Sequence, residues 1–136
     1  MNKLPAFVMA ASALVLVFWV GAQVVGRNVV VTVHNATGGE VTALRVDISG
    51  SGSECARLSP NETWRASFEV EGDSSVALSW SSVESGSVKK SLDVYLMNGD
   101  AGNFQVRLEP AAVIRWQGYL RRRWELSGDT VGGVVW

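Results

Sequence analysis

An uncharged apolar segment near the amino terminus constrains this chain more than any other feature. No Asp, Glu, Lys or Arg occurs between Leu4 and Val25, and only Ser12 and Gln23 are clearly polar. As a helix this run would measure about 33 Å, close to the hydrocarbon thickness of a bilayer. The segment therefore predicts that the protein works at, or just across, a membrane.

Residues 1–26 allow two interpretations. A retained transmembrane signal-anchor helix is indicated by the positive start at Lys3 and by Trp19 near the far end, where interfacial indoles often lie. A cleaved signal peptide is indicated by the small residues at 20–22, which resemble a cleavage site. The apolar run continues through residues 24–25, past that site, and this favours the anchor.

Both interpretations export the rest of the chain. We therefore expect a single-pass protein of the cell inner membrane, with its C-terminal domain on the periplasmic, extracytoplasmic side. Small residues recur along the apolar segment and allow another helix to approach closely, so we expect helix packing in the membrane through Ala6, Ala10, Ala13 and Gly21.

The remaining chain has the size and charge of one ordinary globular domain. The whole sequence has 136 residues, of which 12 are basic and 13 acidic, for a formal net charge of −1. This balance argues against nucleic-acid binding, which normally requires a marked basic excess. The single cysteine, Cys55, excludes an intrachain disulfide.

Short apolar–polar alternations separated by Gly, Asn and Asp turns characterise residues 27–117. Such a pattern is typical of an antiparallel, Ig-like β-sandwich, here of about seven strands. The expected strands are 28–35, 40–49, 63–70, 75–81, 88–96, 104–109 and 113–119. A break in alternation near Leu44 predicts a bulge, and the Gly-Ser stretch at 50–53 predicts a loop. The expected core comprises Trp64, Phe68, Leu78, Trp80, Leu92, Val94, Phe104 and Val106.

Residue types that carry catalysis are sparse and scattered. His34 is the only histidine, and no cysteine or carboxylate cluster lies near it in the sequence. Cys55 has no readable Cys–His motif and is expected to be a small, buried apolar residue. We therefore expect no catalytic, cofactor-binding or metal site and no small-molecule substrate, and we interpret the protein as a non-enzyme.

The C-terminal extension, residues 118–136, holds the only dense basic run. It is interpreted as an edge strand or as an interaction tail. Arginine and tryptophan are enriched at binding hot spots, and three arginines here stand among aromatic residues. The expected partner-binding residues are Trp116, Tyr119, Arg121, Arg122, Arg123 and Trp124. If the extension is an interaction tail, its removal should leave the β-domain folded. If it is an edge strand, its removal should unfold the domain.

Several segments together resemble small, uncharacterised bacterial envelope proteins that carry an N-terminal apolar helix and a compact β-domain. The segments are 31–41 (VTVHNATGGEV), 57–64 (RLSPNETW), the strand start at 74–76, and 92–109 (LDVYLMNGDAGNFQVRLE). The resemblance implies membrane anchoring and a β-domain, with no activity attached. With the apolar segment, it suggests an accessory subunit of a larger membrane or envelope complex, with the bilayer and a protein as partners. The alternative is a secreted β-domain that binds a small ligand or a surface partner.

Overall fold

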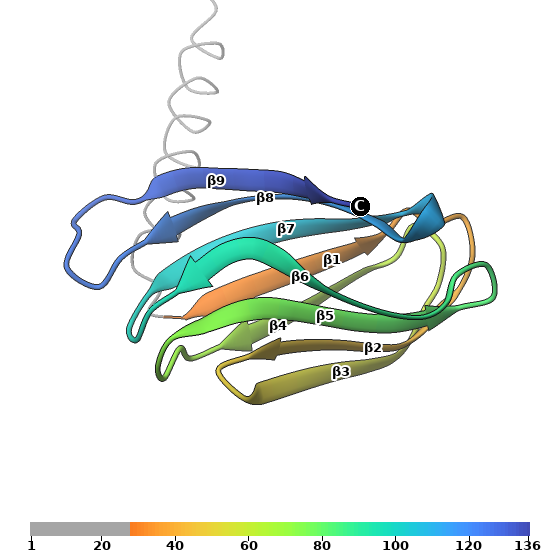
Figure 1. The fold of residues 1–136 in the computed structure, drawn as a ribbon, viewed down its shortest axis with the longest axis horizontal. Helices are drawn as coiled ribbons and strands as arrows, with labels where there is room; N and C mark the ends of the chain where they lie inside the picture. Colours follow the sequence, from red (N-terminus) through yellow and green to blue (C-terminus); the bar gives the residue numbers. More distant parts are fainter. Residues whose placement is uncertain (1–27) are drawn as a thin grey trace, which may run out of the picture.

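Two β-sheets pack face to face in the computed structural model, which describes residues 28–136 (Figure 1). Within these residues there are nine strands and one short 3-10 turn. The elements are β1 (Val29–Asn35), β2 (Val41–Ile48), β3 (Ser51–Leu58), β4 (Thr63–Phe68), β5 (Ser74–Ser82), β6 (Gly86–Leu96), β7 (Ala101–Glu109), η1 (Pro110–Ala112), β8 (Val113–Arg121) and β9 (Asp129–Val135).

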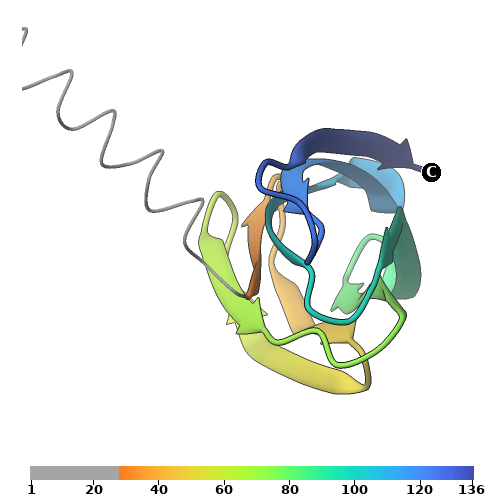
Figure 2. The same ribbon diagram turned by 90° about the vertical axis from the view of Figure 1, so that its left-hand side faces the viewer.

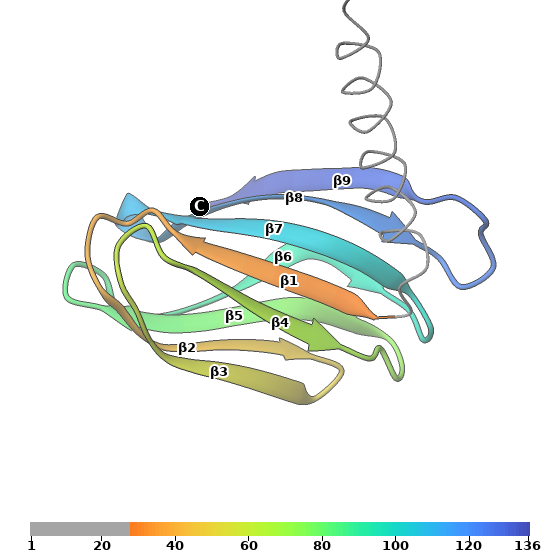
Figure 3. The same ribbon diagram turned by 180° about the vertical axis from the view of Figure 1, so that it is seen from behind.

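The strand order defines a five-stranded and a four-stranded sheet. The first runs β4-β1-β7-β8-β9 and the second β3-β2-β5-β6. Viewed along the strands, the two sheets enclose a common interior (Figure 2), and the view from behind shows β4, β1 and β7 side by side (Figure 3). The predicted all-β sandwich is confirmed. The expectation of purely antiparallel pairing is wrong, because β1 and β7 run parallel.

The expected count of about seven strands is also wrong, because β3 and β9 were not among them. The stretch at 50–53, expected as a loop, begins β3 instead. Ser49 and Gly50 have φ of 53° and 76°, which is the two-residue turn that joins tightly paired strands. Ser51 therefore pairs directly with Ile48, and a Gly-Ser sequence becomes part of a ladder.

The interior is formed by the alternating side chains of both sheets. Val29, Val31 and Val33 of β1 are fully buried, as their period of two predicts. Most of the expected core is confirmed: Phe68, Leu78, Trp80, Leu92, Phe104 and Val106 are buried, while Trp64 and Val94 are partly buried against them. The predicted bulge is present as a register shift between Thr42 and Arg45 in β2.

The C-terminal extension belongs to the sandwich. The expected boundary at residue 117 lies inside β8, and β9 forms the edge of the five-stranded sheet. Between residues 28 and 136 no helix is long and apolar enough to cross a membrane. The expected helix over 1–26, with Ala6, Ala10, Ala13 and Gly21, lies outside the described residues.

A candidate binding surface at one end of the sandwich

Several chain connections meet at the end of the sandwich where β6 and β8 finish (Figure 1). The Gly99 amide donates to the Val70 carbonyl at 3.0 Å, which joins the β6–β7 turn to the β4–β5 connection. The Gly102 amide donates to the Asn28 carbonyl at 3.2 Å. The chain therefore enters β1 at the same end that carries these turns.

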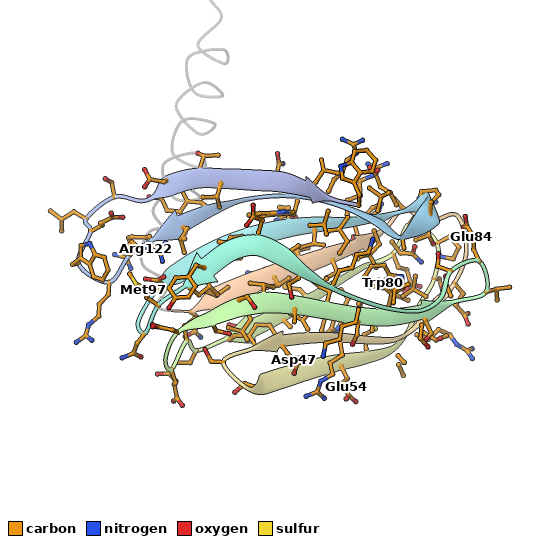
Figure 4. The ribbon with its side chains drawn as sticks, in the orientation of Figure 1. Asp47, Glu54, Trp80, Glu84, Met97 and Arg122 are labelled. Atoms are coloured by element: carbon orange, nitrogen blue, oxygen red, sulfur yellow. The ribbon has the colours of Figure 1, made fainter. Side chains whose placement is uncertain are left out.

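A buried ion pair connects the β6–β7 turn to the segment after β8. Asp100 is fully buried, and its Oδ2 accepts hydrogen bonds from Arg122 Nη1 at 2.5 Å and from the Met97 amide at 2.8 Å. Arg122 also donates to the Tyr95 carbonyl at 3.0 Å. Figure 4 shows Arg122 beside Met97, far from Trp80 and Glu84 at the opposite end. The pair attaches the C-terminal segment firmly to the sandwich.

The C-terminal loop, defined here as residues 122–128 between β8 and β9, is closed by its own hydrogen bonds. The Glu125 amide donates to the Arg122 carbonyl at 3.0 Å, and the Arg122 amide donates to Glu125 Oε2 at 3.4 Å. At the far end of the loop, the Gly128 amide donates to the Tyr119 hydroxyl at 2.6 Å. These bonds link residues within the loop to one another and tie its far end to β8.

Two large apolar side chains project from this loop into solvent. Trp124 is 68% exposed and Leu126 is 95% exposed, although both are residue types that usually gain stability from burial. Arg123 is exposed beside them and its stem covers Gly99, whose φ of 82° suits glycine. The loop thus combines apolar area and positive charge on one fixed support.

A surface hollow of about 380 Å³ adjoins the loop. It is lined by Glu69, Val70, Asn98, Gly99 and the three arginines 121–123. Close to this end, the Tyr95 hydroxyl donates a hydrogen bond to the Asp73 carboxylate, and this bond raises the pKa of Tyr95 because it favours the protonated hydroxyl. Acidic groups therefore offset the arginines at this end, and its character is mixed.

The structure separates the residues that the sequence grouped as partner-binding. Trp116 is only 6% exposed and packs edge-on against Phe104, with ring centroids 5.9 Å apart, so it lies in the core and offers little surface to a partner. Tyr119 closes the loop and Arg122 is engaged by Asp100, so both are structural. Arg121 ends β8 and is half-buried.

Arg123 and Trp124 are the two of these residues that the structure leaves exposed. Leu126 joins them, although sequence reasoning missed it. A signal was present, because Leu126 is an apolar residue directly before the turn-forming Ser127-Gly128, where no strand alternation requires one. Sequence reasoning also misses Asp100 as a structural residue, because an aspartate that follows Asn98-Gly99 is ordinary turn chemistry.

The residues considered for chemistry have local structural partners. His34 Nδ1 lies 3.2 Å from Thr63 Oγ1 on the neighbouring strand β4. Cys55 is half-buried, and its Sγ lies 3.3 Å from the Arg57 carbonyl oxygen. Over residues 28–136, no three His, Cys, Asp or Glu side chains are grouped to hold a metal ion.

Comparison with known proteins adds no relative. No family model, no curated protein and no solved structure matches this chain.

Proposed function

We propose that this protein is a non-catalytic, single-pass membrane protein whose β-sandwich acts in binding or assembly. In this proposal it is an accessory subunit of a larger membrane or envelope complex, with the sandwich on the periplasmic side of the inner membrane. The uncharged run from Leu4 to Val25 supports the anchor. The proposal also takes the sandwich to be immunoglobulin-like.

The observation that carries the proposal is the exposure of Trp124 and Leu126 on a closed loop. Trp124 and Leu126 present apolar area on one loop that a partner would remove from water, and tryptophan beside arginine is the composition of binding hot spots. A loop that is already ordered loses little conformational entropy on binding, so more of the contact energy becomes affinity. The C-terminal loop meets both conditions.

The position of the loop supports a partner close to the membrane. Only residues 27–28 separate the expected helix over 1–26 from β1, and two extended residues reach only about 7 Å. β1 begins at the end of the sandwich that carries the loop. With the helix retained, this end therefore stays near the bilayer, within reach of the extracytoplasmic parts of a membrane-embedded partner protein.

The alternative function is a secreted β-domain that binds a small ligand after signal cleavage. The hollow beside the loop favours it, because a space of about 380 Å³ lined by arginines suits a small polar molecule. The mass of the mature amino terminus separates the two proposals. A first residue at Gln23 would support the secreted domain, whereas an intact Leu4–Val25 run in the carbonate-washed membrane pellet would support the anchor.

The binding role is tested by isolating the full-length protein from its native membrane in mild detergent. We compare the co-purifying proteins of the wild type with those of the double variant Trp124→Ala, Leu126→Ala. Val83→Ala is the matched control, because Val83 is fully exposed in the β5–β6 turn at the opposite end. Loss of a stoichiometric partner from the double variant alone supports the proposal. Identical co-purification from all three proteins would contradict it.

A further inference from the structure

The four edges of the two sheets differ in how they are protected from further strand pairing. Within the described part of the chain, β4 and β9 border one sheet, and β3 and β6 border the other. Natural edge strands usually carry charges, prolines or bulges that prevent pairing with another chain. Three of these edges carry charged side chains: Arg65 on β4, Glu54 and Arg57 on β3, and Lys89, Lys90 and Asp93 on β6.

β9 lacks this protection over most of its length. Asp129 begins the strand, but residues 130–136 (TVGGVVW) contain neither a charged side chain nor a proline. Val134 is 39% exposed and Trp136 is 81% exposed. β6 passes close to β9, but no strand of residues 28–136 pairs with the second edge of β9.

We propose that β9 pairs antiparallel with β9 of a second copy of this chain, which joins the two five-stranded sheets into one continuous sheet. A two-fold axis places β9 of one copy against β9 of the other, so a charged residue near the axis would face the same charged residue of the second copy. No charged side chain occurs over residues 130–136, so this repulsion is absent and a second copy is the occupant that this edge fits. The inference is independent of the C-terminal loop and its partner.

The pattern of faces along β9 restricts the register of this pairing. Val131 and Val135 pack against the core, which places Thr130, Gly132, Val134 and Trp136 on the outer face. Residues directly opposite each other in an antiparallel pair lie on the same face of the sheet. The two-fold axis must therefore pass through a residue of β9, because an axis between two residues would place core-facing side chains opposite outer ones.

An axis at Gly133 overlaps the whole uncharged segment. It places Trp136 opposite Thr130 of the second copy and Val134 opposite its Gly132. Tryptophan against a β-branched residue is a favourable cross-strand pair, and the exposed Trp136 ring gains a neighbour. On the outer face, Val134 then lies diagonally across from Val134 of the second copy, within reach of long side chains.

The test measures the mass of the full-length protein in detergent by sedimentation across a wide range of concentrations. The wild type is expected to form a reversible dimer. Val134→Lys places two like charges near the axis and should raise the dimer dissociation constant by about tenfold or more. Ser67→Lys is the matched control, because Ser67 is exposed on the other edge of the same sheet, and it should dimerise as the wild type does.

A charge exchange separates pairing from misfolding. Val134→Glu alone should weaken the dimer as Val134→Lys does, but an equimolar mixture of Val134→Lys and Val134→Glu should recover wild-type affinity. A wild type that stays monomeric would overturn the inference. So would a Val134→Lys protein that dimerises like the wild type, which is the result expected if the chains associate elsewhere, or a mixture that stays monomeric.

Discussion

Replacing Arg122 by methionine tests the ion pair that attaches the C-terminal segment to the sandwich. Methionine keeps most of the apolar stem but removes the guanidinium from Asp100. The Asp100 carboxylate is 0% exposed and would keep only the Met97 amide as a hydrogen-bond donor, at 2.8 Å. A buried charge that loses its partner is therefore the main cost of this substitution.

The size of that cost follows from the burial of the pair. Removing one partner of a buried ion pair costs roughly 3–5 kcal/mol. The Arg122 side chain is 26% exposed, so water can partly replace the guanidinium, and we take the lower end. We expect Arg122→Met to lower the free energy of unfolding by about 3 kcal/mol, which for a domain of this size corresponds to a Tm lower by about 12 °C.

The assay is urea unfolding of the full-length protein, with two further variants. Arg123→Met removes an exposed neighbouring arginine and should change the free energy of unfolding by no more than about 0.5 kcal/mol. Asp100→Asn in the Arg122→Met background removes the stranded charge and keeps an acceptor for the Met97 amide, so it should recover part of the loss. The reasoning is refuted if Arg122→Met costs no more than Arg123→Met.

Four further measurements test other parts of the structure. Phe104→Ala should lower the free energy of unfolding by roughly 3–5 kcal/mol, because Phe104 is fully buried; an unchanged urea midpoint would contradict this. Asn35→Ala should cost about 2 kcal/mol or more, since the buried amide donates to two carbonyls and accepts from Thr37, and thermal unfolding would report it. Removing residues 118–136 should unfold the domain, because it deletes β9 and half of the buried ion pair; well-dispersed amide NMR signals from the truncated protein would refute this. The raised pKa of Tyr95 means that its bond to Asp73 stabilises the protein below the unfolded tyrosine pKa. That advantage over Tyr95→Phe should disappear as the pH rises through the folded pKa, and equal pH profiles would show that the bond contributes nothing.

The C-terminal segment shows where sequence reasoning stops. The sequence marks Trp116, Arg122 and Trp124 alike, as aromatic or basic residues in one short run. Only the fold distinguishes them: Trp116 faces Phe104 in the core, Arg122 meets Asp100 from a turn 22 residues earlier, and Trp124 faces solvent. Burial depends on which distant segment covers a side chain, and that information is not local.

By itself, the sequence determined the all-β class, the faces of most strands and most of the core. These follow from a period of two, which is local: Val29, Val31 and Val33 share a face whatever lies against them. Tertiary structure alone decided that β1 pairs in parallel with β7, across more than 60 residues, and that β9 completes the sheet. Strand pairing is chosen by the joint burial of remote segments, so a pattern within any one of them leaves the partner undetermined.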